Sequence, residues 1–206
     1  MKNNNFIIIL LAAFSSILYA DIKIQADLFS RYVWRGADYG KSVSLQPQIE
    51  NDFGSVSIGI WGSVPLTTNT LNTNANECDL FINADLGSFN FTLTDYFFPT
   101  YDGTDSLFNI NKHIFEIALS TKVGPLELMS AYNFYGEDKN SIYIEFNRQW
   151  KNSSLFLGFG NGIYSDSGDF IPMNLGLNVS KDQYHASYII NPDKETSFLV
   201  FGVNIK

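Results

Sequence analysis

The residue types best suited to chemistry are a histidine and a serine two positions apart, His185 and Ser187. Alternation along an extended strand would place both side chains on one face, where the imidazole could take the proton of the hydroxyl. Glu145 or Glu116 could then orient the ring. Such a spacing is also a common coincidence, and a polar pair with no chemical role explains it more simply. We therefore predict no catalytic residue.

Two arginines, Arg31 and Arg35, carry more information, because they lie four positions apart on the polar face of an extended segment. Inside a closed sheet such cations must pair with carboxylates or line water. One interpretation is a structural ion-pair network with Asp27, Glu50, Glu77 and Asp79. The other is a constriction that selects solutes by charge. One network can serve both purposes.

Other candidate sites are weak, and we expect no metal and no cofactor. Gly158–Gly162 has the glycine spacing of a phosphate loop, but neither a helix nor a Lys-Ser/Thr pair follows it, so the glycines more simply make room on a strand. His113 is better interpreted as an interfacial residue than as a metal ligand. Five acidic residues in connecting segments lack the ligand spacing of a calcium loop: Asp102, Asp105, Asp166, Asp169 and Asp193.

Composition excludes several classes of protein. The chain has 206 residues, with 13 Lys and Arg against 21 Asp and Glu, and this net charge of −8 argues against nucleic acid as a partner. A single cysteine excludes an internal disulfide, and an aromatic content of 16% argues against disorder. Residues 1–20 have one cation, an apolar run and a final Ala20, which is typical of a secretory signal peptide. The domain predicted to follow is 21–206.

Hydrophobicity alternates with a period of two along almost the whole of that domain, which predicts strands throughout. In 77–86, for example, Leu80 and Ile82 oppose Glu77 and Asp79. Twelve strands are expected, at 22–34, 43–50, 55–64, 77–86, 89–98, 112–122, 126–135, 141–150, 154–163, 170–180, 183–190 and 197–205. Most have about the 9–11 residues that cross a bilayer obliquely.

The connections alternate between long and short, which is typical of an antiparallel up-and-down transmembrane β-barrel of the bacterial outer membrane. The long ones are 35–42, 65–76, 99–111, 136–140, 164–169 and 191–196. Aromatic residues near strand ends fit interfacial girdles: Trp34, Tyr132, Tyr135, Trp150, Tyr164 and Tyr184. A secreted β-sandwich with its apolar face inward is the alternative.

A family resemblance rests on motifs that follow one another along the first half of the chain. Ser30–Gly36 (SRYVWRG) resembles the S-x-Y-V-F/W-R-G motif of the TorF-type porin family, a group of uncharacterised bacterial outer-membrane β-barrel proteins. Gly59–Ser63 is similar to that family's G-x-W-x-S, and Glu77–Phe81 to its E-x-D-L/I-Y/F. Asp95–Pro99 and Glu116 resemble later family positions. The resemblance implies an outer-membrane barrel with channel function and no catalytic residues.

Together these observations predict an outer-membrane channel for passive diffusion of small hydrophilic solutes or ions, made with the barrel assembly machinery and surrounded by outer-membrane lipid. The residues predicted to line its lumen are Lys23, Asp27, Arg31, Arg35, Glu50, Glu77, Asp79, Asp85, Glu116 and Glu145. Glu127 is a further acid on this face, and Lys112 and Lys122 are further bases. The acids still outnumber the bases, so mild cation selectivity is expected. One alternative is a lipid A deacylase-like hydrolase, because His185-Ala186-Ser187 resembles the H-x-S pair of those enzymes. The other is a non-conducting structural or adhesive barrel.

One carboxylate tests the register of the sheet. Counting by two from Phe89 places Asp95 on the apolar face. It either lies at the outer interface, where a charge costs little, or is turned inward by a bulge near Thr94. We favour the bulge.

Overall fold

The computed structural model describes residues 21–67, 76–137 and 140–205. The predicted signal peptide and most of the 65–76 connection lie outside these ranges. No helix among the described residues is long and apolar enough to cross a membrane.

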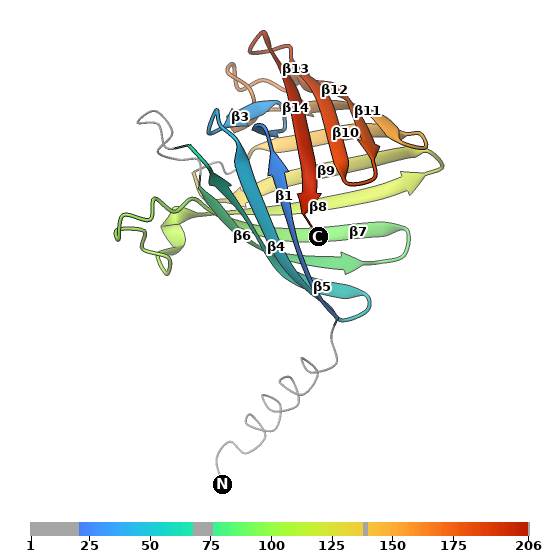
Figure 1. Ribbon diagram of the computed structural model, residues 1–206. Coiled ribbons are helices and arrows are strands. Elements are labelled where there is room, and N and C mark those ends of the chain that lie inside the picture. Colours follow the sequence, from blue (N-terminus) through green and yellow to red (C-terminus); the bar gives the residue numbers. More distant parts are fainter. Residues whose placement is uncertain (1–20, 68–75, 138–139, 206) are drawn as a thin grey trace.

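Twelve antiparallel strands form one closed barrel (Figure 1). Each pairs with its neighbours in sequence, and β1 closes the ring by pairing with both β4 and β14. The β1–β4 pairing spans nine residue pairs, whereas the β1–β14 seam spans four, from Ala26 with Ile205 to Phe29 with Gly202. The strands are β1 (Asp21–Phe29), β4 (Ser44–Asp52), β5 (Val56–Pro65), β6 (Glu77–Asp85), β7 (Phe89–Phe97), β8 (His113–Val123), β9 (Leu126–Tyr135), β10 (Ile142–Gln149), β11 (Ser153–Gly160), β12 (Ile171–Lys181), β13 (Tyr184–Asn191) and β14 (Thr196–Ile205).

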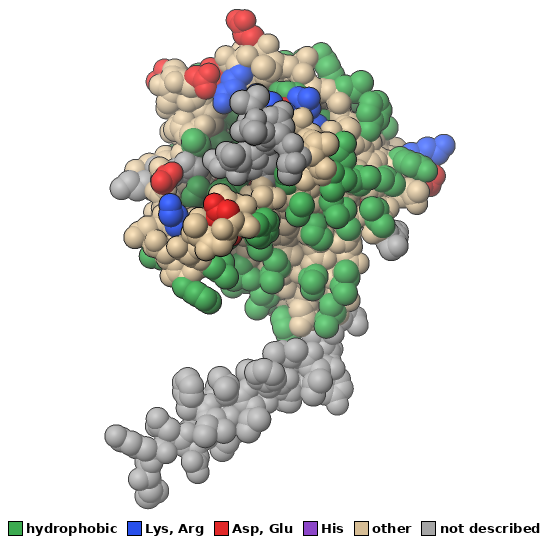
Figure 2. All heavy atoms as spheres, turned by 60° about the vertical axis from the view of Figure 1, so that its left-hand side comes forward, with side chains coloured by type: hydrophobic (Ala, Val, Ile, Leu, Met, Phe, Trp, Pro, Cys, Tyr) green, Lys and Arg blue, Asp and Glu red, His purple; other side chains and the backbone are tan. Residues whose placement is uncertain are grey.

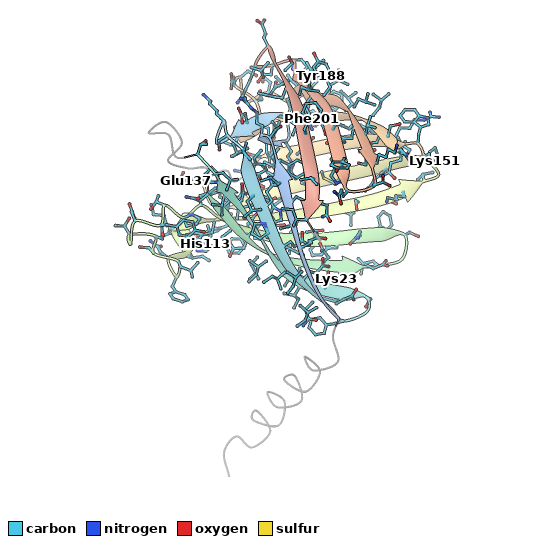
Figure 3. The ribbon with its side chains drawn as sticks, viewed as in Figure 1. Lys23, His113, Glu137, Lys151, Tyr188 and Phe201 are labelled. Carbon is cyan, nitrogen blue, oxygen red and sulfur yellow. The ribbon has the colours of Figure 1, made fainter. Side chains whose placement is uncertain are left out.

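The prediction of a twelve-stranded all-β barrel is confirmed, and most strand ends fall within two residues of their expected positions. Connections at one end of the barrel are tight turns, and those at the other end are longer and carry two single-turn helices, η1 (Ile110–Lys112) and η2 (Gly162–Tyr164). Figure 3 shows Glu137 and His113 on the long-loop side, and Lys23 and Lys151 toward the turns. The predicted alternation of connections is therefore present.

The first strand departs from the prediction. A single strand over 22–34 and an outer loop over 35–42 were expected, but β1 ends at Phe29 and a hairpin follows, formed by β2 (Tyr32–Trp34) and β3 (Ala37–Tyr39). Its two turn residues, Arg35 and Gly36, have φ of 47° and 75°. Positive φ at both central positions is the geometry of a tight hairpin turn, which reverses the chain.

This hairpin folds into the barrel. Tyr32 packs on Trp61 of β5, Arg35 pairs with Glu116 of β8, and Gly36 lies against Met173 of β12. Contact with three such widely separated parts of the wall is possible only from inside. Arg35, which was expected on the polar face of an extended segment, is instead buried inside the barrel at the tip of this hairpin.

The two faces of the wall are inverted relative to a soluble protein. Large apolar side chains on the outer face are exposed, such as Ile24 at 74%, Ile60 at 51% and Leu199 at 60%. The inner face instead buries polar groups, among them Ser63, Asn133 and Asn191. Figure 2 shows hydrophobic side chains gathered over the flank of the barrel, with charged side chains toward its edges.

Asp95 lies on the outer face, and the favoured bulge near Thr94 is absent. Pairing continues unbroken through Thr94 and Asp95 on both sides of β7. The carboxylate is compensated there: its Oδ1 lies 2.8 Å from Nδ1 of His113, whose Nε2 contacts the Leu107 carbonyl of the loop at 2.8 Å. Asp95 therefore stays on the outer face, paired with His113 beneath the loop, and does not turn inward as we expected.

The aromatic girdle is only partly as expected. Tyr132, Trp150 and Tyr184 are exposed near strand ends. Trp34 and Tyr164 instead pack on each other inside the barrel, with ring centroids 6.0 Å apart. They do so because the hairpin and η2 carry them inward.

We expect the folded protein to run faster in a detergent gel than the boiled protein, because a closed ring leaves almost no free strand edge at which detergent could begin to unravel the sheet. Gel migration before and after heating measures this. Identical mobilities would contradict the closed barrel.

Candidate functional site

An ion pair at the tip of the hairpin crosses the lumen. Arg35 binds Glu116 of β8 through two parallel contacts, Nη1 to Oε2 at 2.5 Å and Nη2 to Oε1 at 2.9 Å. The side chains are only 7% and 3% exposed. The hydroxyls of Tyr96 and Tyr164 also donate to this carboxylate, at 3.1 and 3.2 Å. Because its lone pairs are satisfied in this way, the buried charge is compensated.

Aromatic rings enclose the guanidinium. Its Cζ lies 4.3 Å from the ring centroid of Trp34, 4.5 Å from that of Tyr143 and 5.2 Å from that of Tyr164. Contacts of this kind favour a cation over each ring face, and more strongly where water is excluded. The arginine is therefore held by charge on one side and by rings around its plane.

The hairpin turn is fixed to the far wall. The side-chain amide of Asn191 donates to the Gly36 carbonyl at 3.1 Å. A Cβ on Gly36 would come within 2.3 Å of the Met173 carbonyl oxygen, so only glycine fits there. Arg35 itself has φ of 47°, a conformation that costs a non-glycine residue free energy. The contacts of its side chain offset that cost.

A second network lies on β10 and β12 beside the arginine. The Tyr143 hydroxyl donates to Glu145 at 2.6 Å, and the Asn174 amide reaches both, at 2.8 Å and 3.2 Å. A glycine faces this tyrosine: a Cβ on Gly158 would meet the Tyr143 hydroxyl at 2.2 Å. This position agrees with the expectation that the glycines of 158–162 make room on a strand.

The predicted ion-pair partners of the arginines are wrong. Arg31 bonds to Asp38 of β3 at 2.7 Å and Arg35 to Glu116, and the four carboxylates that we expected as partners lie elsewhere on the inner face. The reason is the hairpin, which supplies Asp38 itself and carries Arg35 across the barrel. These partners are far apart in the sequence, so strand alternation could not identify them.

The remaining predicted lumen residues lie along the same inner face without forming one cluster. Lys23 pairs with Asp52 at 3.2 Å, and Asp27 accepts from Asn204 at 2.8 Å. Glu50 is the strand partner of Lys23, and Asp85 caps the turn at Gly87. Lys112 was expected to line the lumen, but it lies in η1 among the loops.

The lumen therefore has one base fewer than expected. It also gains the carboxylate of Asp38, so it is more acidic than expected.

Glu77 and Asp79 form a buried pair of carboxylates on β6. They are 4% and 6% exposed, and no Lys, Arg or His within the described ranges forms an ion pair with them. One oxygen of each, Oε2 and Oδ1, has no hydrogen-bond partner among the described residues. The lumen thus contains acidic groups that the protein itself leaves without a counter-ion.

The hairpin separates two cavities. One of about 470 Å³ lies between the hairpin and strands β4 to β7, and one of about 310 Å³ lies between the hairpin, β1 and the strands from β10 to β14. Tyr32 lines both cavities. The lumen is therefore narrowed by the hairpin and is not one wide channel.

The residues of the hydrolase alternative are not brought together. His185 Nδ1 lies 3.0 Å from the Ser180 hydroxyl, while Ser187 lines the smaller cavity. The two acids that might have oriented the ring are engaged elsewhere, Glu116 by Arg35 and Glu145 by Tyr143. No group of three or more potential metal ligands occurs in the described part of the chain.

The loop over 99–112 adds negative charge at the long-loop end. Asp102 accepts from the hydroxyl and the backbone amide of Thr104, at 2.6 and 2.9 Å, and these bonds lower its pKa below the usual value. Asp105 accepts from the Thr100 and Tyr101 amides. Both carboxylates are thus capped by groups of their own loop.

Sequence reasoning missed the neutral residues that contact the hairpin, namely Tyr143, Tyr164 and Asn191, and Asn174, which hydrogen-bonds to Tyr143. Alternation placed Tyr143 and Asn174 on the polar face, but nothing in it indicated that they meet. The family motifs did contain a signal, because they include Tyr32, Trp61, Tyr96 and Glu116. Trp61, Tyr96 and Glu116 each contact a residue of the hairpin, which contains Tyr32.

These features define a twelve-stranded β-barrel with an apolar exterior and an internal hairpin tied across a polar lumen. The chain belongs to a family described as bacterial proteins of unknown function (Gcw_chp), whose model matches residues 20–181. No curated protein matches.

Solved structures similar to this chain include two mutants of a porin from Rhodopseudomonas blastica. Each has 8% sequence identity, a TM-score of 0.46, and an alignment covering 79% of this chain and 55% of the porin. The chain thus spans just over half the length of these porins.

Replacing Arg35 by alanine should destabilise the fold by about 3–5 kcal/mol, because the buried Glu116 carboxylate would lose its counter-ion. Adding Glu116→Gln to that variant should recover part of the loss. Urea unfolding in lipid vesicles measures both. Lys23→Ala is the control, since its pair with Asp52 is exposed to solvent and should contribute little to stability. Strictly additive effects of Arg35→Ala and Glu116→Gln would contradict the coupling.

Proposed function

We propose that this protein is an outer-membrane channel through which small hydrophilic solutes or ions diffuse passively. The observation that supports this most is the closed barrel whose outward side chains are apolar and whose inward side chains are polar. An apolar exterior suits hydrocarbon, and a closed ring satisfies the backbone where no water is present. A secreted β-sandwich would instead bury its apolar side chains between two sheets and expose its polar ones.

In this proposal residues 1–20 direct export, the barrel assembly machinery inserts the chain, and outer-membrane lipid surrounds it. The long loops then lie outside the cell and the tight turns in the periplasm. The protein carries out no chemical reaction. Its contribution is a polar path across the membrane.

The hairpin would set the permeability of this path. It occupies the lumen between the two cavities, so a solute must pass beside it. A narrow polar passage replaces part of the hydration shell of a solute, and its width and charge select what passes. We therefore expect a small conductance, lower than that of an unobstructed barrel.

Conductance of the purified protein in a planar lipid bilayer tests the proposal. Small, discrete current steps are expected. A folded, inserted barrel that passes no current would favour a structural or adhesive role instead.

An apolar exterior predicts a strong penalty for charge at mid-strand. Leu175→Arg should destabilise the barrel in lipid vesicles by about 2–4 kcal/mol, because this side chain lies at mid-strand among apolar neighbours and would face the centre of the bilayer. Gln25→Arg on the inner face is the matched control and should cost much less. Urea titration of the folded fraction provides the measurement, and equal penalties would show that the faces are assigned the wrong way round.

The excess of acids in the lumen predicts mild cation selectivity at low ionic strength. A low-dielectric wall focuses the negative potential along the lumen and raises the local cation concentration. Near 1 M salt the screening length falls to about 3 Å, so the selectivity should nearly vanish. Reversal potentials across a salt gradient measure this. Anion selectivity would mean that Arg31 and Arg35 control the passage instead.

A further inference from the structure

The larger cavity has an unusual combination of walls. Its residues are mainly aromatic rings and neutral polar groups, and Asp79 is the one charged residue that lines it in the part of the chain that the structure describes. An anion would find no positive charge on such a wall. The cavity therefore suits a neutral or a positively charged ligand.

The carboxylates beside this cavity favour the positively charged ligand. Asp79 and Glu77 point into the lumen two residues apart, more than nine-tenths buried, and an oxygen of each lacks a hydrogen bond within the described residues. Neighbouring buried carboxylates repel each other and lose their hydration, and a cation beside them offsets both costs. The hairpin carries Arg31 and Arg35, but these pair with Asp38 and Glu116.

Aromatic rings surround Asp79. On β5 its strand partner is Trp61, and Phe81 follows two residues later on the same face of β6. Across on β7, the pairing of Leu80 with Asp95 brings Tyr96 beside Asp79.

Two rings of the hairpin, those of Tyr32 and Trp34, complete this group. The Tyr32 ring lies 5.5 Å from that of Trp61, and the Trp34 ring lies 5.6 Å from that of Tyr96. Aromatic faces carry partial negative charge, and a cage of them beside a carboxylate is the chemistry that holds alkylated ammonium groups.

We propose that this cavity binds an alkylammonium ion, with Asp79 as its counter-ion and the rings of Tyr32, Trp61 and Tyr96 around its alkyl groups. A metal ion fits less well, because hard cations take six or more oxygen ligands and this wall offers one carboxylate among rings and amides. At about 470 Å³ the cavity has room for a small organic cation.

The ligand reaches the cavity from the turn end of the barrel. The cavity wall extends from Asp79 toward that end as far as Asn83 and Thr92. Asp85 and Asn90, the next pair along the inner face, are exposed. This inference deepens the proposed function by naming a solute class and rests on it for transport, but the binding itself requires no conductance.

Calorimetric titration of the full-length folded protein in detergent micelles with choline tests the site. The matched probe is 3,3-dimethylbutan-1-ol, which has the same shape without the charge. We expect choline to bind at least about tenfold more tightly than the alcohol, and Asp79→Asn to weaken choline binding by a similar factor. Asp85→Asn, on the same face of β6 but outside the cavity, should retain the affinity. Heat-modifiable migration confirms that each variant is folded.

Equal affinity for choline and the alcohol, or unchanged binding by folded Asp79→Asn, would overturn the site. So would glucose binding without choline binding, which would assign the cavity to sugars. Trp61→Leu provides a second variant, and its full retention of affinity would remove the aromatic cage from the proposal. A protein that conducts but does not bind choline refutes this inference alone, whereas one that binds choline and passes no current refutes the channel alone.

Discussion

The bidentate pair of Arg35 with Glu116 is the interaction on which the interior of this barrel depends. It joins the tip of a hairpin that leaves β1 to a strand on the far side of the ring, 81 residues later in the chain. Without this pair the hairpin would place an unpaired guanidinium and a strained turn among buried aromatic rings. With it, the hairpin becomes a fixed partition, and the shapes of both cavities follow from where that partition lies.

Most of the wall was predictable because one physical constraint acts at every position. In a single-layer barrel each side chain faces either the outside or the lumen, so alternation reports the face directly and the turns report the ends. Leu80 and Glu77 fall on their predicted faces for this reason. Asp95 did not behave as expected, because a carboxylate can stay on the outer face where a neighbouring histidine hydrogen-bonds it and a loop carbonyl holds that histidine.

The hairpin was not predictable by the same reasoning. Tyr32 and Trp34 continue the period-two pattern of β1, so the break after Phe29 leaves that pattern unchanged. Arg35-Gly36 also lacks the Asn-Gly or Asp-Gly pair that usually marks such a turn. Its stability comes from contacts across the lumen, with Glu116, Tyr143 and Asn191, and contacts at such sequence separations have no local signature.

The seam between β1 and β14 has its own consequence. Only the last four residues of β1 pair with β14, so the turn-end half of β1 extends beyond its partner and is held on one side by β4. Because a strand edge held on one side opens more easily, we expect the backbone amides of that edge to exchange their hydrogens early. The same strand continues into the hairpin, which is anchored to the opposite wall. Opening that begins at the free edge of β1 is thus opposed at the other end of the strand, first by its four pairs with β14 and then by the anchored hairpin.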